Sequence, residues 1–322
     1  MKVKEEEANR AISLIGLSKK LSYEGSGVFK HDDGRMRILV AVDFSDYSLR
    51  ACEAAFQVAN LLNAKVKILN VFANLHYPMN VPFANIVRGE ESDGVLDKAR
   101  RKMLALCQEI DDKISKGEMP SVNFSYSLRE GLAEEEIEAF VDSYKPALLV
   151  IGTRGEGRNP KLIGNVAADI IEITNVPVLS VPLQGRVDKL TEIKHIGYLT
   201  NVDKKDLESF DRFVNNTLSL NNDMKITLIH INNSTKEKVF NEMQLLAMKN
   251  HFLEKYPQLN ISYKVLESDN AIALVEEFVV KENVDILSLN TRKRNLLGRL
   301  FIPSMSRKLL KSINIHLLVL RD

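Results

Sequence analysis

The chain has 322 residues, of which 45% are hydrophobic and 27% charged, and its formal net charge is +1. This composition is typical of a globular protein with about two domains, and the balanced charge gives no overall electrostatic attraction to nucleic acid. The apolar runs are only strand-sized and no signal peptide is recognisable, so the sequence predicts a cytoplasmic protein without a membrane partner.

Residues 1–36 are expected to form an N-terminal arm that is partly helical or flexible. Apolar residues between Ala11 and Leu17 repeat at helical spacing. A segment rich in glycine and polar residues follows and predicts a flexible connection to the rest of the chain.

After this arm, short β-branched runs alternate with longer amphipathic stretches. The runs predict strands and the stretches between them predict helices. Regular alternation favours a parallel α/β sheet with helices on both faces, because the crossovers are right-handed. The expected elements are strand 38–42, helix 49–62, strand 65–72, helix 95–114, strand 122–128, helix 134–144, strand 148–151, helix 166–174 and strand 178–181.

A glycine-rich turn, residues 152–157, follows the strand that ends at Ile151, and Gly164 and Asn165 open the next helix. Glycines let backbone N–H groups approach an anion, and a helix N-terminus adds free N–H groups and a positive dipole end. The pattern predicts a site for the phosphates of a nucleotide, although such a glycine also serves turn geometry alone. Because ligands of open parallel sheets bind where the strand order reverses, Asp43 and Gly152 are expected to face one crevice.

These residues resemble the universal stress protein family, whose nucleotide-binding members have a strand ending in Asp and a later glycine pattern. In that pattern two residues separate the first two glycines, nine separate the second and third, and Ser, Thr or Asn follows. Gly152, Gly155, Gly164 and Asn165 match it, but only eight residues separate the second and third glycines here, and one of them is Pro160.

The resemblance extends to Leu128–Gly131 before a helix and to Asn175–Pro182, which is similar to the family's last strand. It implies two doubly wound domains, each with five mostly parallel strands in an adenine-nucleotide hydrolase-like fold. The implied ligand is ATP, or AMP or ADP, with or without Mg²⁺. Asp43 would accept a hydrogen bond from ribose or base, although an Asp after a strand is also a common helix cap. The implied contact residues are Ala41, Val42, Asp43 and Val71 for the adenosine, and Ile151, Gly152, Arg154, Gly155, Gly164, Asn165 and Val166 around the ribose and phosphates.

The chain also contains an internal repeat. The segment Leu128–Gly155 aligns without a gap with Leu266–Lys293, and Ile38–Asp43 aligns with Ile196–Asn201. We therefore expect two homologous domains joined by a polar linker. Their expected limits are 37–183 and 193–322.

The second repeat lacks the residues that are expected to bind the ligand. Asn290 and Lys293 replace the first two glycines, Pro303 occupies the place of the third, and Asn201 replaces the aspartate. A Cβ atom obstructs the close approach of a phosphate to the backbone, and proline removes an N–H donor. The second domain is therefore expected to be structural, with a degenerate site.

The stretch 292–311 is rich in basic residues and contains no acidic one. Such a patch could hold an anion or nucleic acid through its side chains. A solvated helix face beside a degenerate loop explains the same residues and is the favoured interpretation.

Catalytic groups are scarce, and we predict neither catalytic residues nor a metal site. The sequence has no Walker loop, no His-Glu-x-x-His motif and no Gly-x-Ser-x-Gly elbow, and its six histidines are scattered. Cys52 and Cys107 fall among apolar positions and are expected to be reduced core residues. The favoured hypothesis is a nucleotide-sensing regulator that acts on an unknown protein partner. The alternatives are an interaction module without nucleotide, whose domains dock through their last strands or which forms a homodimer, and a slow ATP hydrolase.

Overall fold

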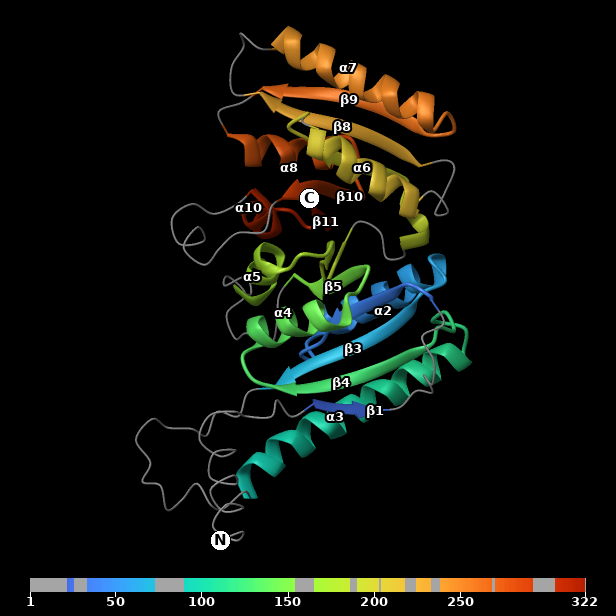
Figure 1. The fold of residues 1–322 in the computed structure, drawn as a ribbon, viewed down its shortest axis with the longest axis vertical. Helices are drawn as coiled ribbons and strands as arrows, with labels where there is room; N and C mark the ends of the chain where they lie inside the picture. The colour runs from blue at the N-terminus through green and yellow to red at the C-terminus, as the bar shows by residue number, and fades with distance from the viewer. Residues whose placement is uncertain are drawn as a thin grey trace, which may run out of the picture.

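The computed structural model describes residues 22–25, 34–72, 90–153, 165–185, 190–202, 204–217, 224–232, 238–267, 270–291 and 305–321. In this part of the chain a single sheet of 11 strands runs along the molecule, in the order β1-β4-β3-β2-β5-β6-β11-β10-β7-β8-β9 (Figure 1). The strands are β1 (Ser22–Gly25), β2 (Arg37–Ala41), β3 (Lys65–Phe72), β4 (Phe124–Glu130), β5 (Leu148–Gly152), β6 (Val178–Val181), β7 (His195–Leu199), β8 (Lys225–Asn232), β9 (Asn260–Glu267), β10 (Ile286–Thr291) and β11 (His316–Arg321).

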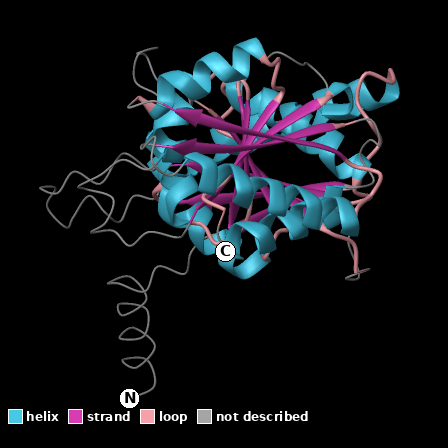
Figure 2. Ribbon diagram, turned by 90° about the horizontal axis from the view of Figure 1, so that it is seen from above, coloured by secondary structure: helices cyan, strands magenta, loops and turns pink. Residues whose placement is uncertain are grey.

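Helices cover both faces of this sheet (Figure 2). One hydrophobic cluster contains residues of α2, α3, α6 and α7, and a second cluster contains residues of α4, α5, α8 and α10. No helix in the described ranges is both long and apolar enough to cross a membrane. The helices are α2 (Asp46–Leu61), α3 (Glu90–Ser115), α4 (Ala133–Tyr144), α5 (Asn165–Ile173), α6 (Lys204–Thr217), α7 (Lys238–Lys255), α8 (Ala271–Lys281) and α10 (Met305–Ser312).

The sheet contains two sets of five parallel strands in mirrored order, β4-β3-β2-β5-β6 and β11-β10-β7-β8-β9. The last strand of each set meets the other: β6 and β11 pair antiparallel, with Leu179 opposite Leu318. The predicted α/β fold with its mostly parallel sheet is confirmed. Because the two sets share one sheet, the domain limits 37–183 and 193–322 stay a prediction.

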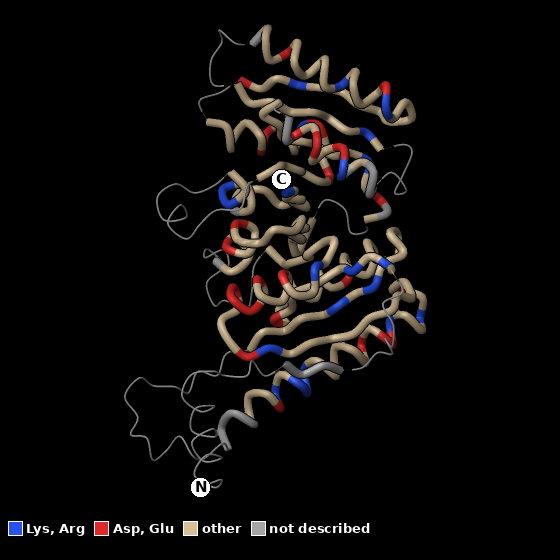
Figure 3. The backbone as a smooth tube through the Cα atoms, in the orientation of Figure 1, with Lys and Arg blue, Asp and Glu red and all other residues tan. Residues whose placement is uncertain are grey.

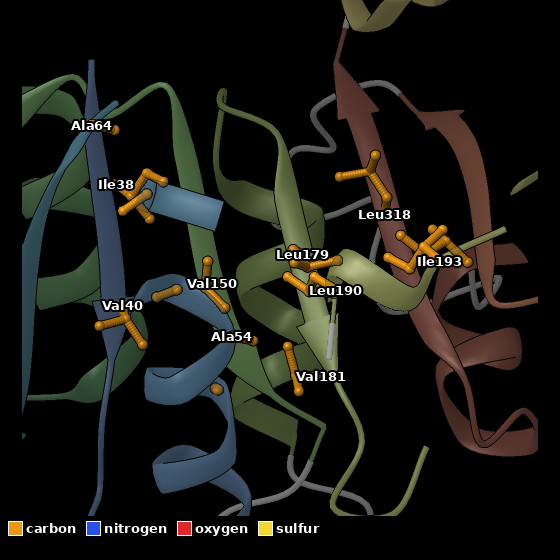
Figure 4. Close-up of a cluster of buried hydrophobic side chains, with 14 of the residues drawn as sticks. Ile38, Val40, Ala54, Ala64, Val150, Leu179, Val181, Leu190, Ile193 and Leu318 are labelled. Atoms are coloured by element: carbon orange, nitrogen blue, oxygen red, sulfur yellow. The ribbon is translucent and has the colours of Figure 1, made fainter. Parts of the chain in front are cut away.

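The hydrophobic core continues across the junction of the two sets. Both clusters draw residues from the first set and from the second. Figure 4 shows part of the junction, where Leu179 of β6 and Leu318 of β11 lie with Leu190 and Ile193 of the connecting segment. Separating the sets would expose these side chains to water, so hydrophobic burial holds the two sets together.

The N-terminal arm contributes a strand that the sequence did not predict. β1 pairs antiparallel with the edge strand β4, with Tyr23 opposite Leu128. It covers a row of backbone groups that an edge strand otherwise leaves unpaired. The helical pattern predicted for Ala11–Leu17 lies outside the described residues.

Candidate functional site

A cavity of about 150 Å³ lies at the carboxyl ends of β2, β3 and β5, with α4 and α5 as its walls. The chain leaves β2 toward β3 on one side and returns to β5 on the other, so this is the point where the strand order reverses. The cavity is smaller than the roughly 300–1,000 Å³ of a typical ligand pocket, so it would enclose only part of a ligand. Its lining residues are Ala41, Val42, Asp43, Ser48, Leu69, Val71, Ala133, Ile137, Ile151, Gly152, Val166, Ala167 and Ile170.

The lining is almost entirely apolar, and Asp43 supplies its one carboxylate. Oδ1 of Asp43 accepts hydrogen bonds from the Ser45 backbone N–H (3.1 Å) and from the Ser45 hydroxyl (2.6 Å). The backbone N–H of Asp43 donates to Oγ of Ser48 (3.2 Å). These bonds fix the carboxylate at the end of β2, beside an apolar cavity.

The N-cap of α2 is Ser45 and not Asp43, although an Asp after a strand is a common helix cap. Ser45 is the N-cap, and its Oγ accepts a hydrogen bond from the backbone N–H of Ser48 (3.3 Å). Asp43 supports this cap through Ser45 instead of capping the helix itself. A serine hydroxyl three residues before the backbone N–H that it accepts from has the geometry that helix caps require.

The turn after β2 belongs to the fold, because the second set repeats it. Phe44 has a φ of 66° and its counterpart Val202 a φ of 60°, a left-handed conformation that is unusual for such side chains. Asn70 donates from Nδ2 to the Val42 carbonyl oxygen (2.8 Å). In the second set Nδ1 of His230 lies 2.9 Å from the carbonyl oxygen of Thr200, the counterpart of Val42.

The packing of α2 against β5 requires a glycine at position 152. A Cβ built on it would lie 2.7 Å from the carbonyl oxygen and 2.8 Å from the carbonyl carbon of Tyr47 in α2. Real Cβ atoms do not approach backbone atoms so closely. The first glycine of the predicted phosphate turn is therefore needed for the contact of α2 with β5, whether or not a ligand binds.

Replacing Gly152 with alanine is expected to lower the free energy of unfolding by about 1–3 kcal/mol, the cost typical of overpacking. Gly94 in α3 is the matched control, because a Cβ there meets nothing within 4 Å. Gly94→Ala should be neutral or stabilising by up to about 1 kcal/mol. Urea unfolding of both variants checks the prediction, and a Gly152→Ala protein as stable as the parent would show that α2 moves away without cost.

The structure brings most of the predicted contact residues to one place. Ala41, Val42, Asp43, Val71, Ile151, Gly152 and Val166 all line the cavity. Asn165 is the first residue of α5, but its side chain is not among those described, and Arg154, Gly155 and Gly164 lie outside the described residues.

Sequence reasoning missed six of the lining residues: Ser48, Leu69, Ala133, Ile137, Ala167 and Ile170. A signal for some of them existed, because Ala133 and Ile137, and likewise Val166 and Ile170, are four residues apart on one helix face. The strand-end rule alone does not include helix residues.

In the second set, polar side chains stand at three positions that align with lining residues of the first cavity: Thr200, Asp206 and Asn290 align with Val42, Ser48 and Gly152. Asp206 is the counterpart of Ser48, since each accepts from a backbone N–H five residues earlier, that of Asn201 in the second set (2.6 Å). The Asp206 carboxylate also accepts from the Thr200 hydroxyl (2.9 Å) and from Nδ2 of Asn290 (3.3 Å). Three residues that align with lining residues of the first cavity are thus joined to one another by hydrogen bonds.

Neither cysteine is activated as a thiolate, because the pKa of each thiol is raised. Burial raises the pKa of the Cys52 thiol far above its usual range, and burial, with a smaller effect of Asp111, raises the pKa of Cys107 to about 11. Cys52 is fully buried, whereas Cys107 is only half-buried at the edge of the core. Among the described residues no cluster of His, Cys, Asp or Glu could hold a metal ion.

Comparison with known proteins identifies the family. Residues 34–182 match the model of the universal stress protein family. A universal stress protein of Methanocaldococcus jannaschii is 30% identical over 148 residues, which cover 45% of this chain and 81% of that protein. The chain belongs to the universal stress protein family. The predicted resemblance is thereby confirmed.

Solved structures of low identity agree with the fold. The universal stress protein of Archaeoglobus fulgidus has a TM-score of 0.63 at 13% identity, and the match covers 88% of this chain and 98% of that one. A functionally unknown protein of Pseudomonas aeruginosa has a TM-score of 0.54 at 14% identity and covers 89% of this chain and 92% of its own. Both matches span the two sets of strands of this universal stress protein, so its fold is shared over nearly the whole chain.

Proposed function

We propose that this universal stress protein binds ATP, or a related adenine nucleotide such as AMP or ADP, in its first set of strands. The observation that carries the proposal is the Asp43 carboxylate, held at the rim of an apolar cavity where the strand order reverses. An apolar slot suits the faces of an adenine ring, and a fixed carboxylate suits the hydroxyl groups of a ribose. The cavity size fits a base better than a complete nucleotide.

The phosphates would extend from the cavity toward the start of α5. Its first residues carry backbone N–H groups without partners inside the helix, and Val166 of the first turn lines the cavity. We propose that Gly155, Gly164, Asn165 and Arg154 complete the phosphate site, with Mg²⁺ as an optional companion of the phosphates. Neither a catalytic base nor a nucleophile enters this proposal, so we infer binding and regulation of a protein partner instead of turnover.

The first experiment is to purify the full chain, denature it and identify any released small molecule by chromatography and mass spectrometry. About one adenine nucleotide per chain would support the proposal. If none is released, ATP with Mg²⁺ is added and thermal unfolding recorded, because a ligand specific for the folded state raises its stability. An empty protein that ATP does not stabilise would contradict the proposal and favour an interaction module.

Asp43→Asn is expected to weaken ATP binding roughly 10- to 100-fold, the effect of losing a hydrogen bond to a charged group. Asparagine keeps an oxygen that can accept from Ser45, and the second set folds with Asn201 in this position. Asp46→Asn, three residues on and exposed in the first turn of α2, is the matched control and should bind as the parent does. Isothermal titration calorimetry measures both, and equal affinities for the two variants would exclude Asp43 from the site.

A further inference from the structure

An ion-pair cluster joins the two sets of strands. Arg307 on α10 donates from Nε to Oε1 of Glu172 on α5 (3.3 Å) and from Nη2 to Oε2 of the same carboxylate (3.1 Å). Nη2 also pairs with Asp169. In Figure 3 the basic residues of α10 lie across from the acidic residues of α5. Such a forked contact fixes direction as well as distance.

The cluster is largely shielded from water. The Glu172 side chain is only 3% exposed, and that of Arg307 is 17% exposed. The sequence had suggested that Arg307 belongs to an anion-binding patch or to a solvated helix face. The structure corrects both interpretations for this residue, because its guanidinium is engaged with two carboxylates of the other set. Lys293, Arg294 and Arg299 of the predicted patch lie outside the described residues.

The helix that Arg307 holds is also a wall of the candidate cavity. Val166, Ala167 and Ile170 of α5 line the cavity, and the same nine-residue helix carries both carboxylates toward α10. A helix this short has little stability by itself and keeps its position through packing. A buried carboxylate that moved away from Arg307 would lose two charge-assisted hydrogen bonds, which is costly. Arg307 therefore opposes any rotation or shift of α5.

We propose that Arg307 is a positioning residue for the nucleotide site: the second set of strands holds α5 where it closes the cavity. The inference rests on the proposed function, since it concerns the same site. It gives the second repeat, whose own site is predicted to be degenerate, a physical role, because this repeat supplies the cation that fixes a helix of the first site. Arg307 touches α5 and acts on the ligand only through it.

The test uses the full chain with three substitutions, Arg307→Met, Arg307→Lys and Lys308→Met. Lys308 is the next residue on α10, is exposed, and serves as the matched control. Arg307→Met is expected to weaken ATP binding roughly 3- to 30-fold, the range of coupling between packed sites. It should also speed hydrogen exchange of the backbone amides 167–173. Arg307→Lys, which keeps the charge, should restore part of both properties, and Lys308→Met should change neither.

The two measurements separate this inference from the proposed function. Equal ATP affinity of the parent and Arg307→Met would overturn the positioning role and leave the proposed function standing. If the parent binds no ATP, the proposed function fails. Hydrogen exchange is then the remaining test of whether Arg307 holds α5 in position. A larger increase of exchange in α5 than in α2 then supports the positioning role, because a loss of global stability speeds exchange in both helices. Unchanged exchange in α5, or an equal increase in α2, overturns it.

Discussion

Arg307→Met is expected to lower the free energy of unfolding by about 3 kcal/mol, the lower end of the range for breaking a buried ion pair. The large effect follows from Glu172, whose side chain is 3% exposed and loses both hydrogen bonds from the guanidinium. The value stays at the lower end because Asp169, the other carboxylate, is 25% exposed and partly solvated. Urea unfolding at pH 7 measures the change.

The control for this prediction is a double-mutant cycle with Glu172→Met. Replacing both members of a buried ion pair by apolar side chains of similar volume is often neutral or stabilising, because no uncompensated charge is then left buried. Asp169 also loses Arg307 in the double variant, but it is 25% exposed and partly solvated. The double variant should therefore be more stable than Arg307→Met alone, by most of the initial loss. A double variant that is as unstable as the sum of the two single variants would show that packing, and not charge, explains the effect.

The fold was predictable because the apolar periodicity of this chain is regular. The alternation of apolar runs and amphipathic stretches from residue 38 to residue 181 corresponds to the strands and helices observed. The predicted limits of the elements differ from the observed ones by a few residues. The strand expected at 122–128 is β4 at Phe124–Glu130, and the helix expected from residue 95 begins at Glu90. Strand ends depend on pairing with neighbours, here β3 and β1, which a local pattern does not contain.

Features that depend on contacts distant in sequence were not predictable. β1 has only four residues, Ser-Tyr-Glu-Gly, and no apolar alternation, so its strand conformation depends on the edge of β4. Arg307 was visible as a basic residue, but no sequence pattern indicated that it faces Glu172, 135 residues away. The sequence shows which residues are basic, but it does not show which acidic residue each of them pairs with.

The candidate site was predicted mainly at its strand ends, and Val166 of α5 is the one helix residue of the lining that was predicted. Asp43 and Gly152 follow from the rule that ligands bind at carboxyl ends of parallel strands, and Val71 follows from the resemblance to the family. Gly152 would be required even without a ligand, because a Cβ atom at this position would collide with the backbone of Tyr47. The second repeat distinguishes the two explanations better. The left-handed turn at Phe44 recurs at Val202 and therefore belongs to the fold, whereas the second set folds with Asn201 in place of Asp43.

Acid is expected to weaken this protein by roughly 3 kcal/mol through His316 alone, since each unit of pKa shift is worth about 1.4 kcal/mol. The pKa of His316 is lowered from its ordinary 6.5 to about 4, mainly by burial and also by the positive charge of Arg50 on α2, whereas Asp285 before β10 opposes the shift. His316 lies in β11 at the junction of the two sets and is 4% exposed. The unfolded chain therefore binds the proton first.

The direction of the effect follows from this order of protonation. Above pH 6.5 the imidazole is neutral in both states and has no effect, and between pH 6.5 and about 4 the unfolded state binds more protons, so stability falls as the pH falls. Below pH 4 both states are protonated and the loss from His316 is complete. Burial, opposed by the hydrogen bond to the Glu282 carbonyl oxygen, also lowers the pKa of His195, which adds a loss of the same sign.

His316→Leu should separate these contributions, because it removes the ionisable group and keeps an apolar side chain in β11. Urea unfolding at pH 7 and at pH 4.5 is expected to give a smaller difference for this variant than for the parent, by about 2 kcal/mol, because most of the window has been crossed at pH 4.5. If His316→Leu kept the full pH dependence, the acid sensitivity would lie with His195 and the carboxylates, and the junction of the two sets would not be its origin.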